Sequence, residues 1–181
     1  LCHLLKSNEK WSIFMNIYTS LNLINYAVVL FFGITTSLCL ADIPFRKHQK
    51  IYLFSYLGFG IVQIAFYLFL GENMLYKCYP MLIHLPLIIL IRFILHKSLS
   101  VSMIAVLSAY LLCTPRKWFG TLISSFFSNN AMAFNISAIL ITIPLLFLVI
   151  RYMAPYITKL KQENKTTLIL FILLPLSYYV L

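Results

Sequence analysis

The residues most able to do chemistry in this sequence are His84, four cysteines and a few polar side chains set in long apolar runs. His84 lies between Pro80 and Pro86, and a proline inside a helix leaves a backbone carbonyl without its usual donor. An ionisable side chain at membrane depth is a functional candidate, although a neutral imidazole bonded to such a carbonyl would be structural. We therefore take His84 as a candidate signal-pocket residue.

Cys78 stands six residues before His84, which raises the question of a thiol nucleophile activated by an imidazole. Such a pair needs a hydrogen-bond contact, but six residues along one helix place two side chains on largely opposite faces. The sequence also lacks a phosphate-binding glycine loop, an HExxH zinc motif and a pair of acidic residues. We therefore predict no catalytic, cofactor-binding or metal-binding residue in this chain.

Composition places the chain in a membrane. Of its 181 residues, 62% are hydrophobic and only 10% are charged, whereas about 25% are charged in a typical soluble domain. The 14 Lys and Arg outnumber the 4 Asp and Glu, and they lie mostly in short gaps between apolar runs. That distribution is typical of cytoplasmic loops rather than of nucleic-acid binding. We expect the lipid bilayer as a partner and no nucleic acid.

A transmembrane helix needs about 20 apolar residues, and the apolar runs predict an all-α, polytopic transmembrane helix bundle of about six spans. Residues 1–22 are expected to form an N-terminal extension and pre-membrane segment, and residues 23–181 a multi-span membrane domain. The runs are apolar on every side, unlike the alternating strands of a membrane barrel. The last span is still apolar at Leu181, so we expect it to be truncated. The expected spans cover residues 23–41, 51–70, 78–95, 98–114, 136–152 and 166–181.

The uncharged segment 118–135 is rich in aromatic residues and broken by Ser and Asn, which suits an interface helix or a re-entrant hairpin. The excess of Lys and Arg after the first, third and fifth spans predicts an outside N-terminus. The segment and the start of the third span then share the outer side, so the segment could cover a pocket at His84. Trp118 from this segment is a second candidate signal-pocket residue.

Gln63 is the third candidate, because it is the main polar residue of the second span. Gln63 and Asn25 are expected either to line a polar cavity or to form interhelical hydrogen bonds, which are the commoner use of such residues in membranes.

Two stretches carry a family resemblance. Residues 79–86 (YPMLIHLP) and 107–120 (LSAYLLCTPRKWFG) resemble the membrane region of bacterial sensor histidine kinases with a C-terminal GHKL-type ATPase domain, akin to peptide-pheromone receptor kinases. The resemblance covers roughly residues 15–181 in span order and loop character. It implies a multi-pass protein of the bacterial inner membrane that receives an extracytoplasmic signal and relays it to a cytoplasmic kinase domain.

That kinase domain is absent from this chain, so the resemblance assigns ATP and Mg²⁺ to the absent domain and leaves enzyme activity of this chain uncertain. The partners that it implies are an extracellular peptide or small-molecule signal, a second copy in a homodimer, and a cytoplasmic response regulator.

Two other functions stay open from the sequence. The alternative to a sensor is a small-solute permease or transporter component, and a ligand-free scaffold is a third option. Only Asp42 and Glu72 stand near the spans, so a cation-coupled transporter would lack its usual intramembrane carboxylates.

Overall fold

The computed structural model describes residues 2–163 and Ser177, and every element in that part of the chain is a helix. The predicted all-α fold is therefore confirmed, while the predicted span 166–181 lies outside the described residues except for Ser177. Three five-residue π-helices interrupt the α-helices of the described chain. In chain order the helices are α1 (Cys2–Leu40), α2 (Gln49–Tyr79), η1 (Pro80–His84), α3 (Leu85–Ile89), η2 (Leu90–Ile94), α4 (Leu99–Ser125), α5 (Ala131–Leu148), η3 (Val149–Met153) and α6 (Ala154–Glu163).

Four helical stretches in the described part of the chain are long and apolar enough to cross a membrane: Ile17–Leu40, Gln49–Ile94, Leu99–Ser125 and Ala131–Lys159. Large apolar side chains also point outward along α2, where Phe54 is 73% exposed and Phe69 is 86% exposed. Lipid accepts such a surface, and water does not. The chain therefore has the character of a membrane protein, but the predicted count of six spans is not supported.

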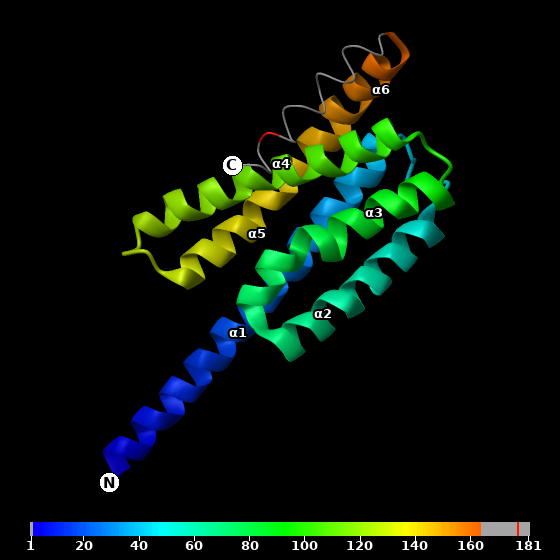
Figure 1. Cartoon of the computed structure of the whole chain (residues 1–181). Helices are drawn as coiled ribbons and strands as arrows, with labels where there is room; N and C mark the ends of the chain where they lie inside the picture. Colours follow the sequence, from blue (N-terminus) through cyan, green and yellow to red (C-terminus); the bar gives the residue numbers. More distant parts are fainter. Residues whose placement is uncertain (1, 164–176, 178–181) are drawn as a thin grey trace.

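The stretch Gln49–Ile94 is 46 residues long, and it changes direction at Gly71. This glycine has φ 79° and ψ 174°, a backbone conformation that side-chain-bearing residues rarely adopt. In Figure 1 the chain runs away along α2 and returns through η1, α3 and η2. Gly71 directly follows the expected second span, 51–70, and lies before the expected third span, 78–95.

Helix α4 is longer than the expected span 98–114. It continues through Pro115 and ends at Ser125. Proline removes only one backbone donor, and in a membrane bundle neighbouring groups can satisfy the carbonyl that it leaves. The expected interface segment 118–135 is consequently the end of α4, a short turn and the start of α5. Asn130 caps α5 by accepting a hydrogen bond from the Met132 backbone N–H at 2.8 Å.

The basic loops gather at one end of the bundle. Lys97 donates to the backbone carbonyl of Asp42 at 3.2 Å, so the loop 95–98 lies beside the loop 41–48. We call this the basic end, because it carries Arg46, Lys47, Lys50, Arg92 and Lys97. The loop 126–130, which joins α4 and α5 at the opposite end, has no Lys or Arg. Under the orientation predicted from the sequence, the basic end would face the cytoplasm, because cytoplasmic loops carry an excess of Lys and Arg.

Helix α1 organises the core, since it packs against α2, α4 and α5. Its fully buried side chains Phe32, Ile34 and Leu38 meet residues from η1, α3 and η2, among them Ile83, Leu87 and Ile91. The apolar core therefore lies toward the basic end, and the polar contacts described next lie farther from it.

Candidate functional site: a polar cavity between helices

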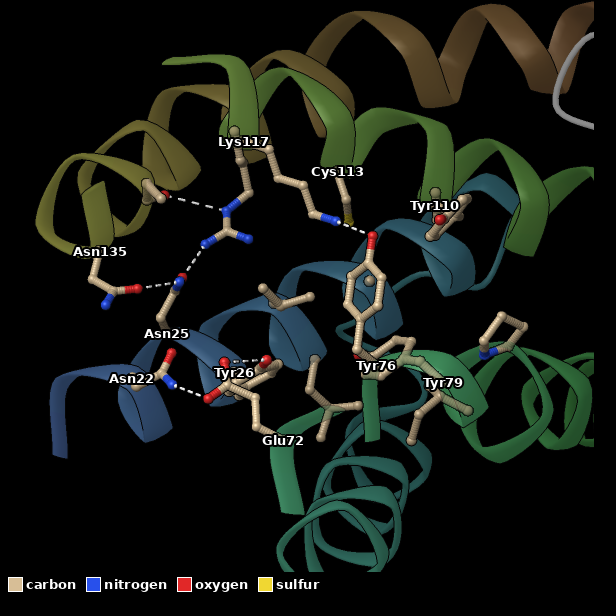
Figure 2. A pocket seen from close by; sticks show the side chains of 18 of the residues that line it. Asn22, Asn25, Tyr26, Glu72, Tyr76, Tyr79, Tyr110, Cys113, Lys117 and Asn135 are labelled. Atoms are coloured by element: carbon tan, nitrogen blue, oxygen red, sulfur yellow. Dashed lines mark hydrogen bonds between the residues drawn. The ribbon is translucent and has the colours of Figure 1, made fainter. Parts of the chain in front are cut away.

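A cavity of about 730 Å³ lies between α1, the end of α2, η1, α4 and α5. This volume falls in the range of small-molecule sites, about 300–1,000 Å³. Its wall is largely apolar but also carries several polar side chains (Figure 2). The charged, amide and imidazole groups in the wall belong to Asn22, Asn25, Glu72, Lys77, His84, Arg116, Lys117, Asn129 and Asn135.

The polar part of the cavity lies far from the basic end. Eighteen residues of α1 separate Asn22 from Leu40, which corresponds to about 27 Å along the helix axis. The hydrocarbon core of a bilayer is about 30 Å thick. If the basic end meets the cytoplasmic surface, the polar side chains lie near the opposite surface of the membrane.

Arg116 joins three helices inside the bundle, and its side chain is only 2% exposed. Its Nε–H donates to the Ala138 carbonyl at 3.2 Å and to Thr142 Oγ1 at 2.5 Å, both on α5. Its Nη2 donates to Asn25 Oδ1 on α1 at 2.6 Å. Asn25 in turn donates to Asn135 Oδ1 on α5 at 2.7 Å, as Figure 2 shows. All these acceptors are neutral.

Glu72 ties α2 to α1 directly after the turn at Gly71. One carboxylate oxygen accepts from Asn22 Nδ2 and the other from the Tyr26 hydroxyl, each at 3.0 Å. Figure 2 shows both bonds at the foot of the cavity. Because the carboxylate is held by two donors from α1, it fixes where the returning arm 72–94 begins.

Lys117 reaches across the cavity from α4 toward α2 (Figure 2). Its ammonium lies 3.4 Å from the Tyr76 hydroxyl and 4.8 Å from the centroid of the Tyr76 ring. A cation over an aromatic face is favoured electrostatically. Lys117 nevertheless remains exposed, so its charge is accessible to a molecule in the cavity.

His84 is buried in the cavity wall at the last position of η1. Its ring lies between two tyrosines, with centroid distances of 5.3 Å to Tyr79 and 5.0 Å to Tyr110. Both contacts are close to edge-to-face, at 73° and 63°, which is a favourable arrangement for aromatic rings. The π-turn, which holds one residue more than an α-turn, sets the direction of this side chain.

The structure does not bring the three predicted signal-pocket residues together. His84 lines the cavity, but Trp118 is 69% exposed on α4 and does not line it. Gln63 is buried on α2 outside the cavity wall, and its Oε1 has no hydrogen-bond partner among the residues that the structure describes. The predicted lid segment 118–135 still contributes to the wall through Ser124, Asn129, Ala131, Phe134 and Asn135.

The charged residues of the cavity were not predicted as site residues. Arg116 and Lys117 look like a basic loop in the sequence, because they follow a proline at the end of an apolar run. One feature of the sequence does point to the cavity. Asn22 and Asn25 are three residues apart, so both amides lie on the same face of one helix. Asn25 was expected to line a cavity or to bond another helix, and it does both.

In the part of the chain that the structure describes, no three His, Cys, Asp or Glu side chains lie close enough to hold a metal ion. Searches against protein-family models, curated protein sequences and solved structures found no match to this chain. The resemblance to sensor histidine kinases therefore stays a prediction, and the cavity is the feature on which a function can be argued.

Proposed function

We propose that this chain is the membrane-embedded sensor module of a two-component histidine kinase in the bacterial inner membrane. It receives an extracytoplasmic signal in the cavity and relays it to a cytoplasmic GHKL-type kinase domain outside this chain. The kinase assignment rests on the sequence resemblance. The observation that carries the sensing role is the polar cavity itself, which lies at the end of the bundle opposite the basic loops.

The position of the cavity suits a signal that arrives from outside the cell. Asn22 in its wall lies about 27 Å from the basic end along α1, so a polar ligand would reach that part of the cavity from the outer surface. A buried binding site with a few polar anchors in an apolar wall is the usual form of a small-molecule site.

The cavity wall also offers a route for relay. Arg116 and Asn25 connect α1, α4 and α5 through hydrogen bonds at the cavity, and α1 continues to the basic end, where it contacts α6. A ligand that bonds these side chains more strongly in one arrangement of the three helices shifts the population toward that arrangement. The cytoplasmic ends of the helices then change their spacing.

The test is a transcriptional reporter driven by the full-length kinase in its own cells. His84→Ala should shift the signal dose-response at unchanged membrane abundance, because His84 lines the cavity. Trp118→Ala serves as the control, since Trp118 faces away from the cavity wall, and it should leave the dose-response unchanged. An unshifted response for His84→Ala at equal abundance would sink the sensing proposal, as would a reading frame that ends without a kinase domain.

One observation favours a second candidate, a small-solute permease or transporter component. Glu72 belongs to the apolar stretch Gln49–Ile94 and lines the cavity, so an intramembrane carboxylate is present after all. A permease moves solute without any kinase. Concentrative or exchange uptake into proteoliposomes that contain only this chain, lost in Glu72→Gln, would favour the permease over the sensor.

A further inference from the structure

The cavity wall carries more positive than negative side chains, whereas the charges of a buried ion-pair network normally balance. Among the described residues of the wall, three carry a positive charge (Lys77, Arg116, Lys117) and one carries a negative charge (Glu72). Glu72 is bonded to Asn22 and Tyr26, and no described carboxylate lies within ion-pair distance of Arg116 or Lys117. The cavity therefore holds an excess of positive charge in a largely apolar surrounding.

Charged side chains at this depth are normally paired with an opposite charge or with water. Among the described residues Arg116 bonds only neutral acceptors, through Nε and Nη2, and no described residue accepts from the two N–H groups of Nη1. Lys117 follows directly in the chain and also faces the cavity. Two cations in the wall of one cavity repel each other, and an oxyanion in the cavity that reaches both would relieve that repulsion while accepting several charge-assisted hydrogen bonds.

The rest of the wall suits an apolar tail. Val29, Leu30, Ile83, Leu87 and Val106 line the cavity, and they lie on the side of the core and the basic end. Val106 precedes Arg116 by ten residues of α4, or about 15 Å. This distance is half of the roughly 30 Å hydrocarbon core of a bilayer, which is the depth that one acyl chain occupies in a leaflet.

We infer that the cavity binds a single-chain amphiphile with an anionic carboxylate or phosphate head, the head at Arg116 and Lys117 and the tail directed toward Leu87 and Val106. The role of this amphiphile as a signal rests on the proposed sensing function of the cavity. The binding itself requires only this chain in a bilayer.

Equilibrium dialysis on the chain in nanodiscs tests the binding, with empty nanodiscs to subtract partition into lipid. Four probes share one tail: dodecanoate, dodecyl phosphate, dodecanol and dodecyltrimethylammonium. We expect saturable excess binding of at least one anionic probe and none of the alcohol or the cation. The two anionic arms separate a carboxylate ligand from a phosphate ligand. Preference for the cation, or equal binding of dodecanol, would overturn the inference.

Two pairs of variants locate the ligand. Lys117→Gln removes an exposed charge from the wall and should weaken anion binding about tenfold or more, as expected for one charge-assisted bond. Lys50→Gln makes the same change at the basic end and should bind like the parent. Equal affinity of Lys117→Gln and Lys50→Gln would mean that the anion binds elsewhere.

The tail is tested at a glycine that lines the cavity. A Cβ built on Gly33 meets no atom within 4 Å, so Gly33→Leu should fold and fill part of the tail volume. Gly58 has equally open space but lies on the exposed face of α2, and Gly58→Leu is the matched control. Binding of the anionic probe should fall in Gly33→Leu alone, and retention in both variants would refute the placement of the tail.

The experiments can contradict the proposed ligand and the proposed sensing role independently of each other. If no anionic probe binds while His84→Ala still shifts the kinase reporter, the ligand class is wrong and the sensing site stands. If the probes bind as expected while His84→Ala leaves the reporter unchanged, the amphiphile site stands and the sensing role is wrong.

Discussion

Gly120 of α4 lies against Phe134 of α5, and replacing this glycine with alanine tests how closely the two helices pack. A Cβ at Gly120 would lie 2.9 Å from Cδ2 and from Cε2 of Phe134, and 3.3 Å from its carbonyl oxygen. The ring can rotate away, but the carbonyl belongs to the first turns of α5 and moves only with the helix. We therefore expect Gly120→Ala to force α4 and α5 apart locally.

Two opposing effects determine how much Gly120→Ala changes the free energy of unfolding. Alanine is more favourable than glycine inside a helix by about 0.8–1.0 kcal/mol, whereas overpacking of a filled site typically costs about 1–3 kcal/mol. Gly58→Ala, which meets no atom within 4 Å, experiences the first effect alone. The difference in unfolding free energy between the two variants should therefore be about 1–3 kcal/mol, with Gly120→Ala the less stable.

A thermal-shift assay with a thiol-reactive fluorophore can measure this difference in detergent, because Cys39, Cys78 and Cys113 are free and half-buried. For a chain of this length about 1 kcal/mol corresponds to roughly 2–4 °C, so Gly120→Ala should melt about 2–12 °C below Gly58→Ala. Equal melting temperatures would refute the close approach of α4 and α5 and, with it, the position of Phe134 in the cavity wall.

Three further predictions concern topology, the amide contact and activity. In a background without native cysteines, Lys47→Cys should resist a membrane-impermeant thiol reagent in intact cells while Phe127→Cys reacts; the opposite pattern would invert the bundle. A double-mutant cycle of Asn25→Ala and Asn135→Ala should give a coupling of about 0.6 kcal/mol in detergent unfolding, and zero coupling would exclude their hydrogen bond. The purified chain should hydrolyse neither ATP nor peptides, and turnover abolished by one point substitution would contradict this.

The helical class and the first boundaries could be predicted from the sequence, because they depend on local properties. The basic stretch 41–50 separates α1 from α2 as expected, and Gly71 marks a break that its φ of 79° explains. Membrane spans are long uninterrupted apolar runs, so the hydrophobic requirement of lipid alone identifies most of them.

The cavity could not be predicted, because its residues come from helices far apart in the chain. Arg116 and Asn25 are 91 residues apart, and their hydrogen bond depends on how α1 and α4 pack. A Pro-Arg-Lys run has the local signature of a loop, and only the acceptors on α5 and α1 make a buried arginine stable within a helix. His84 was found because proline and an ionisable side chain in one span form a local signal.

A π-turn can lose one residue without rotating the helix that follows it. A π-turn holds one residue more than an α-turn, so deleting Met81 from η1 would convert it to a regular α-turn. Leu87 and Ile91 would keep facing the core, although His84 would shift. The same deletion inside α4, which is α-helical throughout, would rotate every later side chain by about 100°. Single-residue insertions and deletions among homologous chains should therefore collect at 80–84, 90–94 and 149–153.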